Sequence, residues 1–157
     1  MINILSITIA IHGVSAAIWV GGMFFAYMCL RPSMGVLDPP QRLKLWAEVF
    51  KKFFLWVWIV ALALPLTGYI QIIGVYGGFE NVGLYVHIMH SIGWMMVVLF
   101  AVLFFGPYRQ FKVAIAEEIW PEAAKHLNRI RMIVAINLVL GLIVTVVATA
   151  GRFWGLI

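Results

Sequence analysis

The sequence predicts an all-α integral membrane protein, a bundle of four transmembrane helices with both termini on the periplasmic side. The first observation is composition, because hydrophobic residues make up 64% of the 157 residues and charged residues only 11%. Soluble domains have about 45–50% apolar and about 25% charged residues. The second observation is that the apolar residues fall into four long blocks. The third is that the basic residues collect in the first and third of the three connections between these blocks.

The first two blocks are each long enough to cross a bilayer, which takes about 20 apolar residues in a helix. The first predicted span covers residues 4–30 and is ended by Arg31 and Pro32. The second span covers residues 53–73. It follows a lysine pair and stops before a glycine-rich turn, and such residues interrupt apolar helices.

The other two blocks meet the same criteria. The third predicted span covers residues 84–105 and stops at Gly106 and Pro107. The fourth covers residues 132–150. Short connections leave no room for a separate soluble domain, so residues 1–157 are predicted to form one transmembrane domain.

The basic residues predict the orientation, because Lys and Arg near span ends are retained in the cytoplasm. Ten of the eleven flank the first and third connections, and only Arg152 lies on the other side. We therefore expect a multi-pass protein of the bacterial inner membrane with both termini in the periplasm. This asymmetry also accounts for the formal net charge of +5, which gives no argument for nucleic-acid binding.

Both basic connections are amphipathic. In the first, Leu43, Trp46 and Phe50 fall on one side of a helix, and Arg42 and Lys44 fall on others. Such a segment is either an interfacial helix lying on the lipid headgroups or a helical extension of the neighbouring span.

Three histidines lie at a similar depth in the predicted bundle. Counting about 1.5 Å per helical residue from the outer span ends places His12, His87 and His90 in the outer half of the bilayer. Polar residues inside a membrane are costly and are usually functional. The sequence therefore predicts a site that faces the periplasm.

A pair of histidines on different helices can hold a b-type haem, each imidazole giving one axial bond to the iron. His12 and His90 are the preferred pair, because their expected depths differ by only a few ångströms. His87, one turn further out, is the alternative ligand or the partner of a haem propionate. Arg152 is placed to bind a propionate through charge-assisted hydrogen bonds.

Further residues share the helical stripes of these histidines. On an ideal helical wheel, Trp19 lies on the stripe of His12, with Gly22 beside it, and Trp94 lies on the stripe of His90. Trp19, Gly22 and Trp94 are therefore candidates to line the faces of a porphyrin.

Copper is the competing ligand. Three intramembrane histidines and eight methionines supply the imidazole and thioether groups that suit this metal. Met89, however, is expected to point about 160° away from the stripe of His87 and His90. In a third interpretation the histidines only bridge helices by hydrogen bonds, in a purely structural or assembly subunit.

The first span reads "IHGVSAAIWVGGMFF", with His12, Trp19, Gly21 and Gly22. This motif resembles the start of the CopD-type copper-resistance membrane domain. The resemblance extends over nearly the whole chain, including "LRPSMGVLDPPQRLKLW", "GGFENVGLYVHIMH" and "RMIVAINLVLGL". It implies either copper uptake and tolerance or haem-based redox chemistry.

The same first-span motif is also similar to HemJ-type protoporphyrinogen oxidases. That family has a Lys shortly after the third-helix His and an Asn-Glu-x-Pro element in its fourth helix. Here the third-helix position reads "HIMH", no Lys lies between Lys52 and Lys112, and Asn137 is followed by Leu138. These departures favour electron transfer over substrate oxidation, because an iron with two axial histidines has no open position.

Together these observations predict a membrane b-type haem protein of the CopD type, with a bis-histidine haem near the periplasmic face. It would be an oxidoreductase that passes electrons between a membrane quinone and a periplasmic redox partner, linked to copper homeostasis. The alternatives are direct copper binding or transport across the inner membrane, which would favour a homodimer, and HemJ-like protoporphyrinogen oxidation.

Overall fold

The computed structural model describes residues 4–154, which are helical apart from short turns and contain no strand within that range. Four helical segments in this range are long and apolar enough to cross a membrane: Ile4–Val36, Pro39–Tyr76, Leu84–Ala116 and Trp120–Phe153. The predicted fold class, an all-α membrane protein with four transmembrane helices, is confirmed.

The four segments are built from α-helices joined by short π-helical and 3-10 turns. The first segment contains α1 (Ile4–Phe24), a π-helical turn (Phe25–Leu30), α2 (Arg31–Ser33) and a 3-10 turn (Met34–Val36). The second is the single helix α3 (Pro39–Tyr76), which a 3-10 turn (Phe79–Asn81) connects to the third. The third contains α4 (Leu84–Leu103), a π-helical turn (Phe104–Tyr108) and α5 (Arg109–Ala116). The fourth contains α6 (Trp120–Ala150) and a 3-10 turn (Gly151–Phe153).

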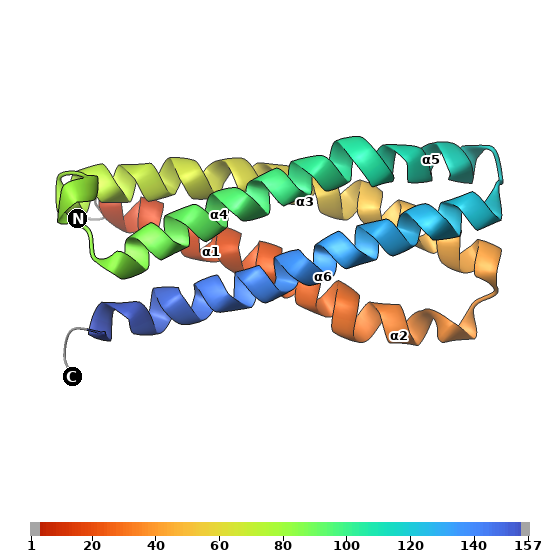
Figure 1. Ribbon diagram of the computed structural model, residues 1–157, viewed down its shortest axis with the longest axis horizontal. Helices are drawn as coiled ribbons and strands as arrows, with labels where there is room; N and C mark the ends of the chain where they lie inside the picture. The colour runs from red at the N-terminus through yellow and green to blue at the C-terminus, as the bar shows by residue number, and fades with distance from the viewer. Residues whose placement is uncertain (1–3, 155–157) are drawn as a thin grey trace.

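The segments run alternately up and down the bundle (Figure 1). The start of α1, the turn between α3 and α4 and the end of α6 lie at one end, which we call the outer end. The turns between α2 and α3 and between α5 and α6 lie at the opposite, inner end. The names follow the orientation predicted from charge, in which the inner end faces the cytoplasm.

Two helices begin well before the predicted spans. α3 starts at Pro39 and α6 at Trp120, so the amphipathic connections are helical extensions of the spans. The cause is burial, because Leu43, Trp46 and Phe50 are 3–5% exposed and continue the apolar face of α3 into the inner end. Proline in the first turn suits the helix start, where the missing N–H has no intrahelical partner in any case.

The inner half of the bundle is filled by an aromatic column made of Trp46, Phe50 and Phe54. These residues follow one another at every fourth position of α3, and successive ring centroids are 5.0 Å apart in stacked pairs. Tyr108 meets Phe54 edge-on at 4.8 Å, and Phe100 of α4 does so at 5.5 Å. Offset and edge-to-face pairs of this kind add about 0.5–1.5 kcal/mol each beyond the area that they bury.

Glycine allows α1 to lie close against α3. A Cβ atom added to Gly22 would collide with the ring of Phe53, whereas one added to the neighbouring Gly21 would meet nothing within 4 Å. α1 and α6 approach each other in the same way, because a Cβ at Gly141 would lie 2.8 Å from a methyl group of Val20. The close crossings of α1 with α3 and with α6 therefore depend on glycine at the contact.

We predict opposite effects for alanine at the two adjacent glycines. Gly22→Ala should lower the free energy of unfolding by about 1–3 kcal/mol, because the methyl group displaces Phe53 from a filled contact. Gly21→Ala should be neutral or stabilising by up to about 1 kcal/mol, since alanine is the better helix former and has space. Unfolding of the purified protein in one detergent measures both, and equal effects would contradict the close contact.

Candidate functional site

The outer half of the bundle contains a cavity of about 940 Å³ that is bordered by α1, α3, α4 and α6. Cofactor and small-molecule sites have volumes of about 300–1,000 Å³ and are mostly apolar. Small residues on all four helices leave this space where larger side chains would fill it: Gly13, Ala16, Ala17, Gly21, Gly68, Gly93, Gly141 and Ala148.

The structure brings most of the sequence-predicted site residues together around this cavity. The lining includes His12, Trp19, His90, Trp94 and Arg152. His12 and Trp19 come from α1, His90 and Trp94 from α4, and Arg152 from the turn after α6. The predicted site therefore draws on three of the four transmembrane segments.

Two predicted residues lie elsewhere. His87 is exposed and does not line the cavity, and its ring centroid lies 6.1 Å from that of Phe79. Gly22 lies at the contact between α1 and α3 and is also absent from the lining. Of the two α4 histidines that the sequence left as alternatives, His90 is the one that borders the cavity.

The hydrogen bond of His12 defines which of its ring nitrogens carries the proton. Nδ1 of His12 lies 2.9 Å from Oγ1 of Thr67, and that oxygen lies 2.7 Å from the carbonyl oxygen of Ala63. Two oxygens at 2.7 Å need a hydrogen between them, so Thr67 donates to Ala63 and accepts from the N–H at Nδ1. Nε2 of His12 therefore keeps its lone pair, the usual arrangement of a metal-ligating histidine.

His90 is held differently. The indole Nε1 of Trp94 lies 3.2 Å from Oη of Tyr69, and Nε2 of His90 lies 3.0 Å from the same oxygen. The indole N–H can only donate, so Tyr69 accepts from Trp94, and the same hydroxyl group is also hydrogen-bonded to Nε2 of His90. Nε2 of His90 is thus engaged by Tyr69, whereas Nε2 of His12 is not engaged by Thr67.

Tyr69 is a site residue that the sequence analysis missed. It lies on α3, two positions from Thr67, and it joins His90 to Trp94 through its hydroxyl group. The sequence feature that could have identified it is a tyrosine hydroxyl group within an apolar span, at the same depth as the histidines. Such a group usually finds a hydrogen-bond partner when it is buried.

The cavity also contains soft metal ligands, but the described residues form no preassembled imidazole or carboxylate metal site. In residues 4–154, no group of three His, Cys, Asp or Glu side chains is close enough to hold a metal ion. Met89 and Met96 line the cavity together with His90. Met89 was expected to point away from the histidines, and it reaches the lining because the cavity extends over a broad part of the α4 surface.

The outer rim of the cavity carries polar groups. The hydroxyl oxygens of Tyr76 and Tyr85 are 2.9 Å apart, and both residues line the cavity with Arg152. The guanidinium of Arg152 lies over the ring of Phe153, 4.6 Å from its centroid. It forms no ion pair within residues 4–154.

We predict that Thr67→Val destabilises the protein by about 1–3 kcal/mol, because the N–H of His12 at Nδ1 loses its acceptor in a buried place. Thr67→Ser keeps the hydroxyl group and should retain most of the stability. Unfolding in detergent at a pH where histidine is neutral compares the two variants. A valine variant as stable as the wild type would show that the imidazole does not depend on this acceptor.

Comparison with known proteins identifies a family. The family model described as CopD, copper resistance protein D, matches residues 47–150, from within α3 to the end of α6. The match includes His90 and Trp94, while His12 lies before it. No curated protein matches the chain, and no solved structure matches it. Since the family model covers more than half of the sequence, the protein belongs to the copper resistance protein D family of membrane proteins.

Proposed function

We propose that the protein holds a b-type haem in the outer cavity, with His12 and His90 as axial ligands, and serves in electron transfer. The observation that carries this proposal is the cavity of about 940 Å³, which has imidazoles from two different helices in its walls. Bundle cores with facing helices are common locations for such cofactors. When bound, haem supplies reversible one-electron chemistry.

His12 is the better prepared of the two ligands. Its Nδ1–H is held by Thr67, which fixes the ring and leaves Nε2 as the ligating atom. His90 would serve as the second ligand once its Nε2 is released from the contact with Tyr69. Two histidine ligands would leave no open position on the iron, which favours electron transfer over chemistry on a substrate.

The remaining lining fits the same ligand. Trp19 and Trp94 both line the cavity; Trp19 is buried against Phe100, and Trp94 is exposed. Arg152 at the outer rim would hold a propionate carboxylate through charge-assisted hydrogen bonds. With the outer end in the periplasm of a bacterial inner membrane, electrons would pass between a membrane quinone and a periplasmic partner, in a role connected with copper tolerance.

We predict that protein purified in mild detergent carries haem with the absorption spectrum of a six-coordinate iron. His12→Ala should lower the haem content by at least about tenfold, because the prepared ligand is lost. His90→Ala should retain haem in a high-spin, five-coordinate form. His87→Ala is the matched control, since His87 lies outside the cavity lining and its loss should leave the spectrum unchanged.

Haem extraction and quantification on the same samples complete this test. A colourless wild-type protein, or a loss of haem in His87→Ala that equals the loss in His12→Ala, would contradict the assignment of the cavity as the haem site.

Copper is the second candidate, and a specific observation favours it. Met89 and Met96 line the same cavity as the two histidines, and thioether and imidazole groups together suit Cu(I). The family description also refers to copper resistance. In this case copper would be the cargo of the protein, and a path for its transport would favour a homodimer.

Methionine variants separate the two candidates. If copper is bound, haem-free protein should retain Cu(I) after dialysis under reducing conditions, and Met89→Leu and Met96→Leu should lower the retained copper by about tenfold. Met95→Leu is the control, since Met95 is 44% exposed and does not line the cavity. Retention of haem and not copper by the wild type and all three variants would reject the copper candidate.

A further inference from the structure

A second cluster of charged side chains lies at the inner end, far from the outer cavity along the bundle. Arg31 begins α2, Arg42 lies near the start of α3, and Arg131 lies in α6. Arg31 and Arg42 are close enough to Arg131 to repel its charge. The ion pairs formed within residues 4–154 use other basic side chains, so none of these three guanidiniums is neutralised by a carboxylate.

Several donors in this cluster are buried without a partner. They are Nε of Arg42, Nε of Arg131 and the indole Nε1 of Trp46. Trp46 is only 3% exposed, and the guanidinium of Arg131 lies 5.8 Å from the centroid of its ring. An unmade hydrogen bond at a buried donor costs about 1–3 kcal/mol, and native structures leave few such groups. An anion with several acceptor oxygens beside Arg131 and Trp46 would satisfy two of these donors and offset the repulsion between Arg31 and Arg131.

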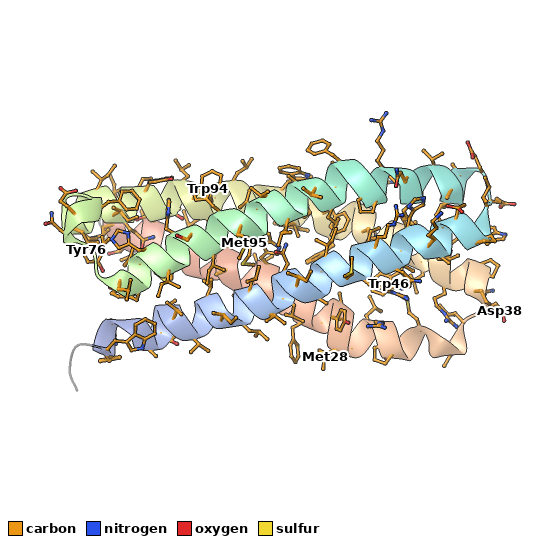
Figure 2. All side chains as sticks on the ribbon, in the orientation of Figure 1. Met28, Asp38, Trp46, Tyr76, Trp94 and Met95 are labelled. Atoms are coloured by element: carbon orange, nitrogen blue, oxygen red, sulfur yellow. The ribbon has the colours of Figure 1, made fainter. Side chains whose placement is uncertain are left out.

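The surroundings of the arginines favour an amphipathic anion. Arg31, Arg131 and Trp46 border one small hollow, and its other walls are apolar or aromatic, including Tyr27 and Phe53. The hollow measures about 20 Å³, so only a small group enters it and the rest of a ligand must lie outside. Figure 2 shows Trp46 between α6 and the segment that leads to α2, with Met28 pointing away from the bundle. Met28 and Phe25 are more than half exposed, which suits contact with hydrocarbon chains.

We propose that Arg31, Arg131 and the indole N–H of Trp46 form a binding site for a phosphate group, carried by an anionic phospholipid of the inner-end leaflet. Guanidinium forks match phosphate oxygens in geometry as well as in charge. Basic pockets between transmembrane helices bind phospholipid headgroups in the same way. The site is independent of the haem and copper candidates, because it lies at the opposite end of the helices.

The test titrates detergent-purified full-length protein with phosphatidylglycerol, phosphatidylcholine and inorganic phosphate, and counts bound molecules by native mass spectrometry. We expect one phosphatidylglycerol to bind about tenfold more tightly than phosphatidylcholine. Arg31→Gln and Arg131→Gln should each remove most of this preference. Arg129→Gln is the matched control, because Arg129 is an exposed neighbour on α6 and its loss changes the net charge equally.

The outcomes distinguish the source of the phosphate. If inorganic phosphate alone binds and the same two variants abolish it, the site belongs to free phosphate instead of a lipid. Arg31 is exposed, so Arg31→Gln leaves the packed core unchanged. If Arg131→Gln does not fold, the lipid preference of Arg31→Gln alone decides the test. No preference for phosphatidylglycerol in the wild type, or an equal loss in Arg129→Gln, would overturn the proposal.

Discussion

The packing of large rings along α3 is the constraint on which the rest of the structure depends. Trp46, Phe50 and Phe54 stack at every fourth residue and hold α3 against Phe100 and Tyr108 of the third segment. With no hydrophobic effect between helices in lipid, such close contact must supply the association energy. The inner half is therefore densely packed apart from one small hollow, and the outer half, which has glycine on every helix, can remain hollow without loss of the bundle.

The same helix that carries the aromatic column also controls the chemistry of the hollow half. Thr67 and Tyr69 both lie on α3, and their hydroxyl groups meet the imidazoles of α1 and α4 respectively. The order of donors and acceptors in these contacts decides which ring nitrogen is left for a ligand. The residues that pack the inner end and those that hydrogen-bond to the histidines thus belong to the same helix.

Much of the fold could be predicted from the sequence, because apolar blocks bounded by charge leave few alternatives in a membrane. The prediction placed the start of the second span near residue 53, since it treated the lysine pair before it as the boundary. Lys51 and Lys52 are exposed, yet Phe50 and Phe54 on either side of them are buried, and the helix continues through. Depth along the helices was enough to propose that His12 and His90 share a site. The partners of their ring nitrogens were not predictable, because they depend on how α3 is rotated against its two neighbours.

The two imidazoles give the cavity a polarity of its own. On α1, the ring of His12 keeps a lone pair at Nε2, while on α4 the Nε2 of His90 is already engaged by the hydroxyl group of Tyr69. A ligand that needs a ring nitrogen would therefore find one ready on α1 and one already engaged on α4. Binding would then proceed in order, first to α1 and afterwards to α4, and only the second contact would cost a hydrogen bond of the empty bundle.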